Sequence, residues 1–498
     1  MQKKLLGDTA IYGLSSILGR TLNYVLVPIH SKFFPPGEYG TFTELYAYIA
    51  FLNVIFTYGL ETSFFRYATK EREKLAQYFN LAQSSIFITT LIGGLALYFS
   101  SFGIANSLGY PEQLNVVRWL ILILCIDTIV AIPFARLRLL GKAKQFATFR
   151  IASILLNVGI NVFYFVLIPA LLEHEIVSAE SIQWIYKPEW RIEYVFLANL
   201  IANGFFLLFF IPTWIQFRFS FSTEVFTPVV KYALPIMVLG LAGVTNEMLS
   251  RALLKYILPE GFYEGRTNLA ALGIFGAVYK LSIFMTLAVQ AFKYAYEPFF
   301  FKKAADADSK RMNSKVMTGF IYFTCISWIL LTIILPELAP IFLRRPDYLE
   351  GLSIVPILLG GGVFLGVFYN LSVWYKLTDN NWLGAMISIG GAFTTIILNV
   401  VLIPIWGYHG SAWAAFITFL SMSIASYFMG RKHYPIPYEV GKGVLYLGLA
   451  FLVVMFFTFF PLSVWMRYLL GGIVVIVYFF VVFRLENLKD VLNLRRLS

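Results

Sequence analysis

The chain has 498 residues, of which 59% are hydrophobic and 13% charged, and its mean hydropathy is +0.74. Soluble globular proteins carry roughly 25% charged residues, and one water-soluble core cannot bury so large an apolar excess. The net charge of +12 is distributed in short clusters beside apolar runs, which excludes a nucleic-acid-binding surface and indicates a membrane protein that contacts anionic lipid headgroups.

The apolar runs are long and unbroken, which favours spanning helices over a barrel, whose strands would alternate polar and apolar residues. The first run follows Lys3 and Lys4 without a small-residue cleavage site, so we interpret it as a retained span. In chain order the sequence predicts about fourteen spans, at residues 8–33, 38–66, 78–102, 114–138, 146–170, 192–216, 226–258, 271–300, 315–338, 351–376, 382–404, 410–430, 440–460 and 464–484.

Basic residues concentrate in every second loop. Clusters occur at 66–74, 136–144, 302–311 and 431–432, whereas the alternate loops are poor in lysine and arginine. The positive-inside rule therefore predicts that both termini lie in the cytoplasm. The largest loop on the opposite side, 173–189, is short, which leaves little room for an extramembrane catalytic domain and argues against an enzyme.

Three separated patterns recur at an offset of 231 to 235 residues. The constant offset predicts two six-helix lobes, 1–222 and 223–438, that form a parallel internal repeat. Residues 439–498 then form a helix pair with a cytoplasmic tail, and the almost wholly apolar pair is expected at the lipid-facing periphery. The matching sets are Leu18, Arg20, Leu22 and Pro28 with Leu249, Arg251, Leu253 and Pro259; Gly40, Phe42 and Tyr46 with Gly273, Phe275 and Tyr279; and Leu167-Ile168-Pro169 with Leu402-Ile403-Pro404.

Polar side chains inside the predicted spans share narrow helix faces, which predicts a polar cavity between the lobes. In the seventh span, Glu247, Arg251 and Lys255 follow one another at intervals of four residues. Because Arg20 and Arg251 occupy matched repeat positions, we expect them to face each other and to bind an anion. Other polar residues on these shared helix faces are Asn23 in the first span, Asn157 and Asn161 in the fifth, and Gln290, Lys293 and Glu297 in the eighth.

The acidic residues of the spans are candidates for coupling transport to an ion gradient. Asp127 has no basic residue within a helical turn, so it could bind a proton or cation; packing against a hydroxyl from another helix is the alternative. The other acidic candidates have simpler explanations, because Glu247 with Arg251 and Lys293 with Glu297 have the spacing of intrahelical ion pairs. Lys255 could extend to the membrane interface. The remaining acidic candidate is Glu61. The sequence contains no metal-ligand or nucleotide-binding motif, so no cofactor is predicted.

Four stretches carry a family resemblance: 13–20 (GLSSILGR), 38–40 (EYG), 58–67 (YGLETSFFRY) and 399–412 (NVVLIPIWGYHGSA). With these stretches in this order, the chain resembles, over essentially its full length, the polysaccharide-exporter branch of the superfamily that includes multidrug and toxin extruders and lipid II flippases.

The resemblance implies a flippase in the bacterial cytoplasmic membrane. It would move a polyprenyl-pyrophosphate-linked oligosaccharide outward by alternating access, for surface polysaccharide or lipopolysaccharide synthesis. The resemblance also implies a glycan polymerase or ligase as partner and a groove for the lipid tail along the last two helices. The cations expected to hold the pyrophosphate are Arg20, Arg251, Lys255 and Lys293.

Three rival functions stay open. A drug or cation antiporter of the same superfamily would need an acidic or aromatic cavity, whereas the deep positions here are net basic. A membrane glycan polymerase or ligase would need a long catalytic outer loop. A lipid II flippase would share the fold, and the sequence does not separate it from an oligosaccharide flippase.

Overall fold

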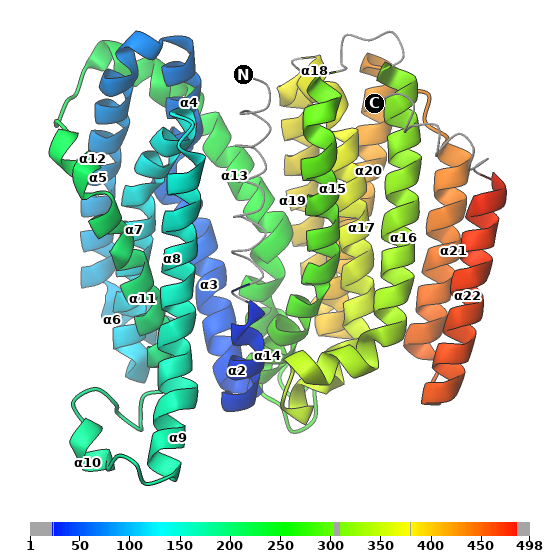
Figure 1. Ribbon diagram of the computed structural model, residues 1–498, viewed down its shortest axis with the longest axis horizontal. Helices are drawn as coiled ribbons and strands as arrows, with labels where there is room; N and C mark the ends of the chain where they lie inside the picture. Colours follow the sequence, from blue (N-terminus) through cyan, green and yellow to red (C-terminus); the bar gives the residue numbers. More distant parts are fainter. Residues whose placement is uncertain (1–21, 23, 303–308, 379, 486–498) are drawn as a thin grey trace. The chain divides into compact units, whose positions relative to one another are not determined.

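The computed structural model describes residues 22, 24–302, 309–378 and 380–485. Within these residues helices alternate with loops and no strand occurs (Figure 1). Thirteen helical stretches of the described chain are long and apolar enough to cross a membrane. They confirm the predicted polytopic helical fold. Most of the first predicted span, 8–33, lies outside the described residues, and α2 (Leu26–Phe33) is its described end.

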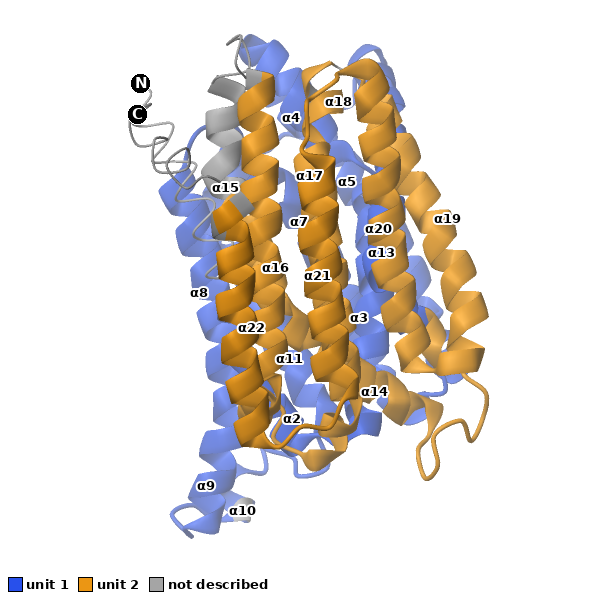
Figure 2. Ribbon diagram, turned by 90° about the vertical axis from the view of Figure 1, so that its right-hand side faces the viewer, with its two compact units in different colours: residues 1–252 blue, residues 253–498 orange. Residues whose placement is uncertain are grey.

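The chain divides into two compact units, Met1–Ala252 and Leu253–Ser498 (Figure 2). Besides α2, unit 1 contains α3 (Pro36–Thr57), α4 (Leu60–Lys70), α5 (Leu75–Phe99), α6 (Ser101–Ser107), α7 (Leu114–Leu139), α8 (Ala143–Val162), α9 (Ile168–Glu173), α10 (Ala179–Ile182), α11 (Ile192–Phe209), α12 (Ile211–Gln216) and most of α13 (Thr223–Ile257). A π-helical turn joins α8 to α9, so the fifth predicted span is one continuous helical stretch.

Unit 2 contains the rest of the helices. They are α14 (Asn268–Tyr279), α15 (Ile283–Lys302), α16 (Ser309–Phe342), α17 (Val355–Leu371), α18 (Val373–Leu377), α19 (Asn381–Trp406), α20 (Tyr408–His433), α21 (Val440–Phe459) and α22 (Val464–Leu485). Helix α17 is buried along most of its length and packs against α16 and α20. The indole of Trp328 donates to the carbonyl of Pro356 at 2.7 Å, which joins α16 to α17.

The last two helices pack against α16 and leave large apolar side chains exposed. Leu452, Phe459, Trp465 and Ile476 are among these exposed residues. Such faces are stable in hydrocarbon and unfavourable in water. This exposure supports the predicted peripheral, lipid-facing place of the pair.

Helix α13 runs across the division between the units, which falls after Ala252. Its first part packs against the second predicted span of unit 1. The hydroxyl of Ser63 in α4 donates to the carbonyl of Val229 in α13 at 2.8 Å. The lobe boundary at 222/223 stays a prediction.

The second predicted span, 38–66, is two helices rather than one. Tyr58 (φ 31°) and Gly59 (φ 75°) adopt left-handed backbone conformations between α3 and α4. A β-carbon at Gly59 would collide with the carbonyl of Ala233 in α13. Glycine is therefore required both by the backbone conformation and by the close approach of α13.

We expect Gly59→Ala to destabilise the protein more than Gly109→Ala. Gly109 has nearly the same conformation, φ 79°, but no atom lies within 4 Å of the position that a β-carbon would occupy there. Gly109→Ala should cost only the left-handed strain, roughly 1–2 kcal/mol, whereas Gly59→Ala adds an overpacking cost of about 1–3 kcal/mol. Thermal unfolding of both purified variants in detergent measures the difference, and equal shifts would show that α13 yields to the methyl group.

Candidate functional site

A polar network lies inside unit 1 between α3, α7 and α11. The side-chain amide of Asn203 donates to Asp127 at 3.0 Å, and that of Asn199 donates to the hydroxyl of Tyr46 at 2.6 Å. Asn199 and Asn203 are four residues apart and so share one face of α11. Asp127 is therefore held by an amide from another helix, rather than by the hydroxyl that the sequence left open as its partner.

Arg150 of α8 is the cation that interacts electrostatically with Asp127. Its guanidinium carbon lies 4.1 Å from the centroid of the Phe134 ring, 5.4 Å from that of Phe206 and 5.9 Å from that of Phe146. These contacts are cation–π interactions with a packed aromatic cluster. Arg150 lies on the same helix as Asn157 and Asn161 but was not among the predicted binding residues.

Asn157 and Asn161 form a second polar group with His30. Asn161 donates to the side-chain oxygen of Asn157 at 2.9 Å, and its own oxygen lies 2.9 Å from Nε2 of His30. His30 and Asn161 are buried. This group joins α2 to α8 and shows that the predicted stripe of α8 faces the end of the first span. In the sequence His30 is recognisable only as a residue near a helix end, without a sign of this contact.

Glu44 of α3 is a buried acid that was not predicted as a site residue. It is fully buried and accepts hydrogen bonds from the hydroxyls of Tyr48, at 2.9 Å, and Tyr110. Its position inside the second predicted span could have identified it from the sequence, because an acid within a span is costly unless it has polar partners. Here the two tyrosine hydroxyls are those partners.

Arg251 and Lys255 lie on α13, as predicted. Arg251 is half-buried, and its Nη1 lies 2.5 Å from the sulfur of Met248. The Nζ of Lys255 lies 5.1 Å from the centroid of the Tyr256 ring, and Glu247 is exposed. Because the three charged residues are four positions apart, they follow one side of the helix.

Several predicted residues cannot be compared with the structure. Arg20 and Asn23 lie outside the described residues, so the expected pairing of Arg20 with Arg251 stays a prediction. Lys293 and Glu297 belong to α15, but their side chains lie outside the described part. Gln290 is half-buried, and its side-chain oxygen has no hydrogen-bond partner in the described part of the chain.

Glu61 differs from its expected place as a membrane-buried acid. It lies in the first turn of α4 and forms an ion pair with Arg138 at the end of α7. The side chains of Glu61 and Arg138 are 41% and 40% exposed. The break at Gly59 redirects α4, which brings Glu61 to this arginine. The pair neutralises its charge and makes Glu61 a weaker coupling candidate than Asp127.

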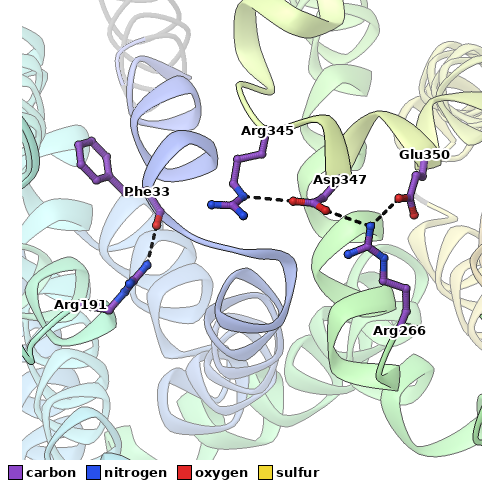
Figure 3. A network of polar contacts seen from close by, with 6 residues as sticks. All are labelled: Phe33, Arg191, Arg266, Arg345, Asp347 and Glu350. Carbon is purple, nitrogen blue, oxygen red and sulfur yellow. Dashed lines mark hydrogen bonds and ion pairs between the residues drawn. The ribbon is translucent and has the colours of Figure 1, made fainter. Parts of the chain in front are cut away.

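Arginines in the loops that are otherwise poor in lysine and arginine bond to acidic side chains or to a backbone carbonyl (Figure 3). In unit 2, Arg266 bonds to Asp347 at 3.0 Å and Glu350 at 2.5 Å, and Arg345 bonds to Asp347 at 3.2 Å. The bonds to Glu350 and Asp347 raise the pKa of Arg266, so it stays charged. In unit 1, Arg191 donates to the carbonyl of Phe33 at 2.7 Å. These arginines join loops and are not candidates for ligand binding.

Among the described residues no group of three histidines, cysteines or acids could hold a metal ion. In unit 1 the candidate functional residues are the buried amides, the tyrosines, Asp127 and Arg150.

A family model described as polysaccharide biosynthesis protein matches residues 5–302. The chain belongs to this polysaccharide biosynthesis family. A search of curated proteins finds no match. The predicted resemblance is confirmed at the level of the family.

Solved structures show that this member of the polysaccharide biosynthesis family has a transporter fold. A structure of the lipid II flippase MurJ in an inward closed conformation aligns with a TM-score of 0.68 and 14% identity, over 95% of this chain and 98% of that chain. An inward-facing multidrug resistance MATE transporter aligns with a TM-score of 0.59 and 14% identity, over 85% and 97%. The Vibrio cholerae MATE transporter VcmN in its bent form aligns with a TM-score of 0.52 and 13% identity, over 89% of this chain and 98% of that chain.

Proposed function

We propose that this protein is a flippase that moves a polyprenyl-diphosphate-linked oligosaccharide from the cytoplasmic to the outer leaflet of a bacterial cytoplasmic membrane. One observation carries the proposal: a chain of the polysaccharide biosynthesis family has the helical fold of flippases and transporters. Polysaccharide synthesis on a lipid carrier needs such a transfer step, because the polar headgroup cannot cross hydrocarbon unaided.

The chemistry of the cargo fits the polar residues of the spans. A diphosphate requires cations, and arginine binds phosphate with paired donors. In this proposal the cations are Arg20, Arg251, Lys255 and Lys293, and the amides that contact sugar hydroxyls are Asn23, Asn157, Asn161 and Gln290. The side-chain oxygen of Gln290, which has no partner among the described residues, can accept a hydrogen bond from such a hydroxyl. Asp127, Glu247 and Glu297 are the acids proposed for ion coupling.

A drug or cation antiporter is the second candidate, because the MATE transporters share the fold. An antiporter for organic cations needs accessible acidic groups, whereas Asp127 is opposed by Arg150 and Glu61 is paired with Arg138. These contacts favour an anionic cargo.

Deleting the gene and measuring lipid-linked glycans by mass spectrometry tests the proposal. We expect a polyprenyl-diphosphate oligosaccharide to accumulate and surface glycan to be lost, both restored by the wild-type gene. The accumulating species identifies the cargo, since accumulation of lipid II would indicate a lipid II flippase. An unchanged lipid-linked pool together with a lower resistance to cationic drugs would overturn the flippase and support the antiporter.

A further inference from the structure

Arg150 is an arginine within a span of unit 1 that is held by aromatic rings. In the described part of the chain it makes ring contacts and is attracted to Asp127, but it has no hydrogen bond and no ion pair. By contrast, Arg136 donates to Gln216, and Arg138 is paired with Glu61. A guanidinium carries five N–H donors, so Arg150 retains its hydrogen-bonding capacity.

The aromatic cluster holds the guanidinium carbon of Arg150 through contacts with three phenylalanine rings. Phe134 lies edge-on to Phe206 at 5.0 Å and to Phe146 at 5.4 Å between ring centroids, and Phe134 and Phe206 are buried. A planar guanidinium that stacks by its face keeps the N–H groups at its edge for another ligand. The rigid rings thereby reduce the entropy lost when an anion binds.

The position of Arg150 suits a headgroup at the membrane interface. It lies seven residues after Ala143, the first residue of α8, or about 10 Å along the helix axis. The residue as a whole is exposed, while its guanidinium lies against three phenylalanine rings. A charge without a hydrogen-bond partner inside a span is costly, so this guanidinium requires water or an anion. By the predicted orientation, the beginning of α8 is its cytoplasmic end.

We propose that Arg150 is the entry-side anion-binding residue of unit 1, which receives the diphosphate of the lipid carrier from the cytoplasmic leaflet. This assignment rests on the proposed function. Asp127 attracts the same guanidinium without forming an ion pair, so its negative charge weakens the hold on the diphosphate. Asn203 donates to the Asp127 carboxylate, Tyr46 interacts with it electrostatically, and Arg138 is the further charge that acts on Arg150.

The test measures binding of farnesyl diphosphate and of inorganic pyrophosphate to the purified full chain in nanodiscs of phosphatidylcholine. We expect Arg150→Gln to weaken farnesyl diphosphate binding by about 10–100-fold, the loss of one or two charge-assisted hydrogen bonds. Arg150→Lys keeps the charge but not the paired donors, so its affinity for farnesyl diphosphate should lie between those of the wild type and Arg150→Gln. Asp127→Asn should tighten binding by about fivefold, the lower end of usual coupling between sites.

Arg136→Gln is the matched control, because Arg136 also stacks on a phenylalanine, Phe79, at 4.6 Å, in the same unit. It should change the dissociation constant by less than about twofold, the effect expected of a cation that does not touch the anion. Thermal unfolding of each variant shows whether it is folded.

Three outcomes would contradict the proposal in different ways. Equal binding by folded Arg150→Gln and wild type overturns the assignment of Arg150 and leaves the proposed function standing. A wild-type protein that binds neither probe overturns the diphosphate-carrier function itself. If phosphatidylglycerol in the nanodisc competes with farnesyl diphosphate in the wild type, and Arg150→Gln changes only that competition, Arg150 contacts bilayer lipid and not the carrier.

Discussion

Replacing Arg251 by alanine is expected to abolish display of the surface glycan while the protein still inserts in the membrane. A diphosphate that loses one guanidinium loses hydrogen bonds worth about 1.5–3 kcal/mol each, a decrease of roughly 10–150-fold in affinity. Arg251→Lys should retain part of the transport, because lysine keeps the charge without the paired geometry. Lectin staining of intact cells measures the glycan, and immunoblots of membranes measure the protein.

Arg467→Ala is the control for this experiment. Arg467 donates to the carbonyls of Thr332 and Phe457 at 3.4 and 3.1 Å and joins α22 to its neighbours. Its loss should lower the thermal stability but leave glycan display intact, because it has no proposed contact with cargo. Arg20→Ala belongs in the same series, since Arg20 is the repeat-matched partner. Normal glycan display by both Arg20→Ala and Arg251→Ala would remove the proposed diphosphate site.

The helices could be predicted because their physical signal is strong and local. A membrane span needs about 20 apolar residues, and the predicted spans 114–138 and 440–460 agree closely with α7 and α21. The break at Gly59 could not be predicted, since it depends on the carbonyl of Ala233 from a helix far along the chain. A glycine alone within an apolar run does not show which residue approaches it.

The polar residues were easier to find than their partners. Helical periodicity placed Asn157 and Asn161 on one face of the fifth span, and both lie on α8. Periodicity within one helix carries no information about the facing helix, so the contacts of His30 with Asn161 and of Asn203 with Asp127 could not be predicted. The pairing of Glu61 with Arg138 was missed for the same reason.

Asp127→Asn is expected to remove the response of transport to a proton or sodium gradient and to leave the response to membrane potential. In the wild type, a cation bound at Asp127 cancels the charge that attracts Arg150, so the cation and the diphosphate should strengthen each other's binding, as linkage requires. The potential acts separately, because an inside-negative voltage drives an anionic headgroup outward by about 2.3 kcal/mol per charge per 100 mV. Asparagine keeps the hydrogen-bonding shape but carries no charge to neutralise.

Proteoliposomes separate these two forces. A potassium diffusion potential set with valinomycin supplies voltage alone, and opposed sodium or pH gradients at zero potential supply the ion gradient alone. The wild type should respond to both, whereas Asp127→Asn should respond only to voltage. Asn203→Leu provides an intermediate case, because it removes the amide that donates to Asp127 at 3.0 Å and leaves the charge of Asp127 in place. The response of this variant to the ion gradient should be weakened and not lost. An ion-gradient response in Asp127→Asn equal to that of the wild type would show that Asp127 has no part in coupling and that its attraction to Arg150 serves only the folded state.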